Sequence, residues 1–177
     1  GECSMKIMLS LLLSVVCCGC ITKRPYHTVP IKHGGPAVYV FAIEEETWFS
    51  VKARNALARI VRHASRELAL STNSLQSVKT LEVINHAIKA EGFRFGGTVP
   101  GLSTSLEVGL LDCSDLTFIY LEIAHIWDVD IQVAFSPDHI MVVLPTSDRI
   151  VFWETLGGFE CLPKDMISEG LVDSRSV

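Results

Sequence analysis

Hydrophobic residues recur with helical spacing in three segments of the chain. Residues 51–70, 75–91 and 112–127 each carry an apolar stripe, and the arginines of the first segment lie off its stripe. The polar residues 71–74 separate the first two segments, and Gly92 stands where a glycine that ends a helix is expected. The stripes consist of Leu57, Ile60, Val61, Ala64 and Leu68; Val78, Leu81, Ile84 and Ile88; and Leu116, Ile119, Tyr120, Ile123 and Trp127. The pattern therefore predicts three amphipathic helices.

After residue 130 the pattern changes to one typical of β-strands. Apolar residues alternate over 131–135, and short apolar runs at 139–144 and 149–155 are separated by turn residues. Another strand is expected at 37–43, and the glycine- and proline-rich residues 92–109 are expected to form a long loop. Helices followed by an antiparallel meander predict an α+β fold, with the helices packed on a small antiparallel sheet.

The first 20 residues resemble an export signal. Lys6 precedes about ten apolar residues, the layout of a signal peptide and too short a run to span a membrane. Gly19-Cys20 resembles the end of a bacterial lipoprotein signal, in which the cysteine is lipidated and becomes the first mature residue. Residues 1–4 precede Met5, the expected initiator, and are interpreted as a misassigned start or a non-native remnant. Signal cleavage without lipidation is the alternative hypothesis.

These features predict how the chain is organised. We expect a signal peptide at 1–19, a lipidated Cys20 with a tether at 20–36, one domain at 37–172 and a frayed tail at 173–177. The lipid would anchor the protein to a membrane of the bacterial cell envelope, facing the periplasm, unless the chain is secreted.

Composition and charge narrow the possible functions. The 177 residues are 49% hydrophobic and 20% charged, a composition that folds. The net charge of −5 and the lack of a long basic run argue against a nucleic-acid partner. Because four of the six cysteines lie within the first 20 residues, a disulfide-rich miniprotein is excluded. Only Cys113 and Cys161 could pair within the folded domain.

Cys113 lies at the predicted start of the third helix. The free N–H groups and partial positive charge of a helix N-terminus favour the nucleophilic thiolate, and the N–H groups can hold an oxyanion. Asp112 or Ser114 can cap this helix, and Asp115 is well placed in its first turn. The placement of this cysteine therefore indicates a nucleophile.

His139 and Glu154 lie on strands that the turn at residues 145–148 should join into a hairpin. In two of the pairing registers their side chains share a face, directly opposite or on a diagonal, and a register shifted by one residue separates them. In the favourable registers Glu154 can orient the imidazole, and His139 can serve Cys113 as base and then as acid.

The segment from Leu111 to Gly158 resembles the transglutaminase-like superfamily of papain-type folds. In that family a cysteine at a helix N-terminus is followed by a histidine and an acidic residue on consecutive strands. The resemblance covers roughly residues 80–158 and implies a papain-like core. It also implies roles for four residues: Cys113 as nucleophile, His139 as base, Glu154 as orienting acid and Asp115 as the supporting acidic residue.

The resemblance further implies a cysteine hydrolase or acyltransferase that acts on amide or peptide bonds and needs no cofactor. Its substrate would be a peptide or protein of the cell envelope. Glu107 stands where papain-like enzymes carry an amide that completes the oxyanion hole. The alternative is therefore an inactive binding or scaffold lipoprotein of the same fold, in which the 92–109 loop and the aromatic strand would form a peptide groove.

A third hypothesis is a structural lipoprotein stapled by a Cys113–Cys161 disulfide. No pair of histidines has zinc-ligand spacing, so no metal site is expected. The off-stripe histidines are expected to be solvated or half-buried, and the tryptophans to line the core or a groove. These residues are His63, His86 and His125, and Trp48, Trp127 and Trp153.

Overall fold

The computed structural model of the chain describes residues 35, 37, 50–71, 74–97, 99–135 and 139–161. The expected signal peptide, Cys20, the rest of the tether except Gly35, and the tail lie outside these residues, as does Trp48. Of the strand expected at 37–43, only Ala37 is described, and it is helical and fully buried, against the prediction.

The three predicted helices are confirmed as α3 (Val51–Leu70), α4 (Val78–Ala90) and α6 (Cys113–Trp127). Helix α3 begins where the Ser50 hydroxyl accepts a hydrogen bond from the Ala53 N–H. Helix α4 begins later than expected, since residues 75–77 form a bend. Gly92 follows α4 with a φ of +82°, the left-handed conformation in which glycine ends helices. The stripe residues are buried, except for the half-buried Val61, Val78 and Trp127.

The prediction of a long loop at 92–109 is wrong, because this segment contains a strand and a helix. Strand β1 (Arg94–Phe95) pairs in parallel with β2 (Leu110–Leu111), and the short helix α5 (Leu102–Val108) lies between them and packs on α3. Leu102 and Leu106 are buried. Gly101 and Gly109 flank α5 with φ values of +83° and +78°, so glycines that suggested a loop instead mark the ends of a helix.

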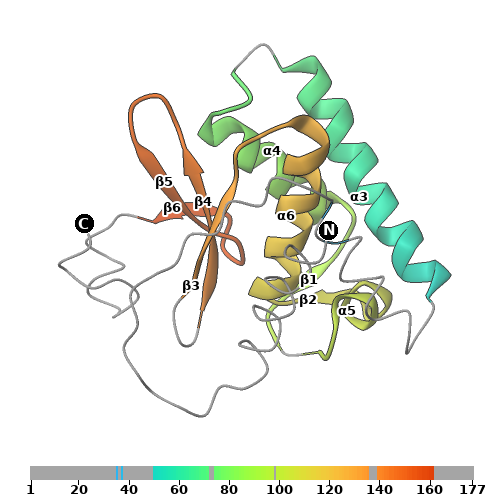
Figure 1. Cartoon of the computed structure of the whole chain (residues 1–177). Coiled ribbons are helices and arrows are strands. Elements are labelled where there is room, and N and C mark those ends of the chain that lie inside the picture. The colour runs from blue at the N-terminus through green and yellow to red at the C-terminus, as the bar shows by residue number, and fades with distance from the viewer. Residues whose placement is uncertain are drawn as a thin grey trace, which may run out of the picture.

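The antiparallel meander is confirmed as four strands in the order β3-β4-β5-β6 (Figure 1). They are β3 (Gln132–Phe135), β4 (Ile140–Pro145), β5 (Ile150–Glu154) and β6 (Phe159–Cys161). Strand β6 was not predicted. It forms because Gly158, with a φ of +73°, lets the chain turn back and pair Glu154 with Phe159.

One face of this sheet packs against α6 and joins the main core through Val142, Leu144, Val151 and Trp153. The Tyr120 hydroxyl connects three elements. It accepts a hydrogen bond from Trp153 Nε1–H of β5 at 2.8 Å and donates one to the Leu81 carbonyl of α4 at 3.3 Å. Since an unpaired buried hydroxyl is costly, these bonds fix how α4, α6 and the sheet meet.

The described residues thus form an α+β fold of four helices and a small antiparallel sheet, as predicted at that level. None of these helices combines the length and the hydrophobicity needed to cross a bilayer.

Candidate functional site

The start of α6 is held by reciprocal hydrogen bonds between two carboxylates and the backbone. Asp112 Oδ1 accepts from the N–H groups of Ser114 and Asp115 at 2.8 and 3.0 Å. In return, Asp115 Oδ2 accepts from the Asp112 N–H at 3.1 Å, which completes a capping box. Cys113 follows the cap directly, so these bonds fix the backbone from which its thiol projects.

The capping box reduces the number of backbone N–H groups in the first turn of α6 that can donate to a substrate. We expected its free N–H groups to hold an oxyanion, but those of Ser114 and Asp115 already donate to Asp112. The N–H of Cys113 itself is not among the groups that donate to Asp112. Asp115 is 5% exposed and bonded to the backbone, so it positions the start of the helix.

His139 and Glu154 share a face of the β4–β5 hairpin. Val142 pairs with Trp153, and this register places Glu154 opposite Met141, two positions along the chain from His139. The diagonal arrangement predicted for one of the favourable registers is therefore confirmed. His139 Nε2 and Glu154 Oε2 are hydrogen-bonded, and their side chains are 17% and 16% exposed. Glu154 Oε1 accepts a second hydrogen bond, from the Leu156 N–H at 2.9 Å.

The imidazole of His139 also hydrogen-bonds the Cys113 side chain. The bonds to Cys113 and to Glu154 raise the pKa of His139 from 6.5 to about 10, although burial opposes the shift. Burial alone would raise the pKa of Glu154, but the hydrogen bonds from His139 and from the Leu156 N–H outweigh it and hold that pKa below its ordinary value. The site therefore favours a protonated imidazole beside an ionised carboxylate.

Cys113, His139 and Glu154 thus meet although they come from the start of α6, the residue before β4 and the end of β5. Cys161 does not join them. No disulfide joins Cys113 and Cys161, and Cys161 packs with Met141 and Val143 in a second apolar cluster. The disulfide hypothesis is therefore contradicted.

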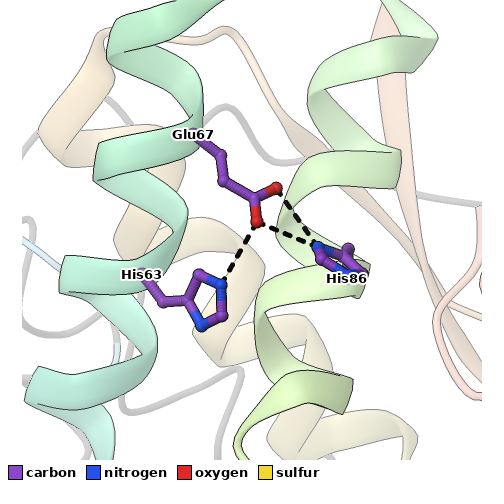
Figure 2. A group of neighbouring side chains, drawn as sticks. All are labelled: His63, Glu67 and His86. Atoms are coloured by element: carbon purple, nitrogen blue, oxygen red, sulfur yellow. Dashed lines mark hydrogen bonds and ion pairs between the residues drawn. The ribbon is translucent and has the colours of Figure 1, made fainter.

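A second polar cluster, which the sequence analysis missed, lies between α3 and α4 (Figure 2). It consists of His63, Glu67 and His86. His63 and His86 are half-buried and exposed, as expected, but Glu67 hydrogen-bonds both of them. The only part of this cluster that the sequence could have revealed is the pair of His63 and Glu67, which are four residues apart and therefore one turn apart on a helix. Only the packing of α4 on α3 brings in His86.

Comparisons of the chain with protein-family models, with curated proteins and with solved structures found no match. The geometry of the Cys113, His139 and Glu154 side chains is therefore the basis on which a function is inferred.

Proposed function

We propose that the protein is a cysteine hydrolase or acyltransferase that acts on amide or peptide bonds. The observation that carries this proposal is that one imidazole, His139, hydrogen-bonds Cys113 and Glu154 at the same time. A nucleophile, a base and a group that orients the base are the minimal set for thiol-based acyl transfer.

In the first half of the reaction, the Cys113 thiolate attacks the substrate carbonyl carbon. A carbon–sulfur bond forms, and the carbonyl electron pair moves onto the oxygen. The Cys113 N–H, which does not donate to the capping carboxylate, donates to that oxyanion. The carbon–nitrogen bond then breaks, and imidazolium His139 gives its proton to the leaving amine.

In the second half, water or a second amine attacks the thioester. Neutral His139 takes the proton of this nucleophile, and the Cys113 thiolate leaves. Glu154 keeps the imidazole oriented and stabilises its positive charge. Because Glu154 Oε2 engages His139 Nε2, ring atom Nδ1 is the nitrogen left to meet the thiol.

We further propose that the domain is transglutaminase-like. Two features support this. The cysteine begins a helix that packs on an antiparallel sheet, and the histidine directly precedes one strand of that sheet while the acid ends the next strand. The proposed location in the cell envelope and the lipid on Cys20 rest on the N-terminal sequence. A peptide or protein of that compartment is the proposed substrate.

The rate of Cys113 alkylation as a function of pH tests the proposal. Labelling is read by peptide mass spectrometry, which separates Cys113 from the other cysteines. An ordinary thiol, with a pKa of about 8.5, is only about 0.3% ionised at pH 6. A thiolate paired with His139 should label at least about tenfold faster than that at pH 6, even though a paired thiolate is less nucleophilic.

The variant His139→Ala should lose this acid-range labelling. His125→Ala, which removes an exposed histidine on α6, is the matched control and should keep it. If Cys113 labels slowly and accelerates only near pH 8.5 in the unmodified protein, the thiol is inert. The alternative of an inactive binding module would then replace the proposal.

A further inference from the structure

Two helices contribute to the polar cluster of Figure 2. His63 and Glu67 lie one turn apart on α3, and His86 faces them from α4. Glu67 Oε1 lies 3.2 Å from His63 Nε2 and 3.0 Å from His86 Nδ1, and one donor atom from each residue lies within 4.8 Å of the others. We propose that these three side chains bind a divalent transition-metal ion, for which zinc fits best.

The spacing of the donor atoms supports a metal. Zinc binds nitrogen and oxygen ligands at about 2.0–2.2 Å, so two ligands of a tetrahedral site lie about 3.2–3.6 Å apart. The separations of 3.2 and 3.0 Å between Glu67 Oε1 and the two imidazole nitrogens come within a few tenths of an ångström of that range. Small side-chain rotations would admit the ion without moving either helix.

The chemistry of the donors selects the kind of ion. Two imidazoles and one carboxylate suit zinc and its neighbours cobalt and nickel, whereas magnesium and calcium prefer oxygen ligands alone. The side chains of His63, Glu67 and His86 are 31%, 32% and 67% exposed, so water can fill the fourth position. The site therefore has three protein ligands and an open position.

A further carboxylate is placed to support one of the ligands. His63 Nδ1 lies 3.7 Å from Glu91 Oε1, and Arg59 Nε donates to Glu91 Oε2 at 2.9 Å. A histidine that binds a metal through one ring nitrogen commonly donates its other N–H to a carboxylate. Glu91 is thus a positioning residue for His63, and Arg59 holds Glu91 in place.

A bound ion would cross-link α3 and α4. Residues 63 and 86 are far apart in the unfolded chain, so the complete set of ligands exists only once the helices have packed. Binding would then stabilise the folded state, and at a free zinc concentration one hundred times Kd the unfolding constant should fall about 100-fold. Since imidazoles bind metal only when neutral, the affinity should weaken at acidic pH.

Zinc and cobalt titrations of the full chain test the site. Because thiols also bind these metals, the deciding quantity is the difference between variants. His86→Ala and Glu67→Gln should each lose one bound ion per chain, with affinity reduced at least about 100-fold. The difference between the cobalt spectrum of the unmodified protein and that of either variant is the signal of this site. That difference should contain no thiolate-to-cobalt charge-transfer band. Glu91→Gln should weaken binding about tenfold or more.

His125→Ala is the matched control, because it removes an exposed histidine outside the cluster, and it should bind like the unmodified protein. Circular dichroism verifies that each variant is folded, and magnesium in excess should not compete. The proposal is overturned if the unmodified chain, His86→Ala and Glu67→Gln bind the same number of zinc ions with the same affinity. It is also overturned if the lost cobalt signal carries the thiolate band.

Discussion

Replacing Glu154 with glutamine should lower the pKa of His139 without returning it to its ordinary value. That pKa is raised from 6.5 to about 10, with the bond to Cys113 as the larger cause and the bond to Glu154 as the second. At about 1.4 kcal/mol per pKa unit, the whole shift corresponds to about 4–5 kcal/mol, and screening by water that reaches the ring reduces it to about 2–3 kcal/mol. A nearby opposite charge contributes roughly 1–3 pKa units. The pKa of His139 in Glu154→Gln should therefore lie at about 7–9, still above its ordinary value of 6.5.

The assay is an NMR titration of protein labelled at histidine, with His139→Asn used to assign the His139 signal. Cys113→Ser is the comparison variant, and it should also lower the pKa of His139, because the bond to Cys113 is the first-ranked cause of the shift. The reasoning would be refuted if His139 titrated near pH 6.5 in the unmodified protein. An unchanged pKa in Glu154→Gln or in Cys113→Ser would refute it equally.

Three further outcomes are expected. A raised histidine pKa stabilises the fold fully below about pH 6.5, and this stability is lost as the pH rises through about 10. The stability gap between the unmodified protein and His139→Ala in urea unfolding should therefore shrink from pH 6 to pH 10; a constant gap would contradict the shift. Tyr120→Phe leaves Trp153 Nε1–H without its acceptor and should cost about 1–3 kcal/mol in the same assay, whereas a cost near zero would show that the bond is unimportant. Asp112→Ala should cost about 0.5–2 kcal/mol through loss of the helix cap, and Asp112→Asn, which can still cap, should cost clearly less.

The helices were predictable because their signals are local. Each of the three predicted helices has an apolar stripe several turns long, so its own residues determine which face is buried. The segment at 92–109 has no such signal, because α5 is only seven residues long and its flanking glycines resemble loop residues. The two-residue strands β1 and β2 exist only through their pairing with each other, which no local pattern encodes.

The site of Cys113, His139 and Glu154 was predictable from the sequence, whereas the cluster of His63, Glu67 and His86 was not. The order of Cys113, His139 and Glu154 along the predicted elements indicated a shared site. Because side chains alternate between the faces of a strand, the sequence also specified which pairing registers would bring His139 and Glu154 together. Asp112 was one of two caps that the sequence allowed for α6, but its hydrogen bonds to the N–H groups of both Ser114 and Asp115 depend on side-chain rotamers and were not predicted. His86 lies on a different helix from His63 and Glu67, and it reaches them only because α4 packs on α3. The spacing of residues within one helix cannot predict that packing.

The order in which these elements occur in the chain has a consequence for biosynthesis. Cys113, the proposed nucleophile, begins α6, whereas His139 and Glu154 lie on a hairpin that follows it and therefore leaves the ribosome later. A nascent chain that has formed its helices carries Cys113 with no base beside it, so the cysteine remains an unactivated thiol. Under the proposed function, reactivity arises only when the hairpin docks. The polypeptide would thus be harmless to its surroundings until folding is complete.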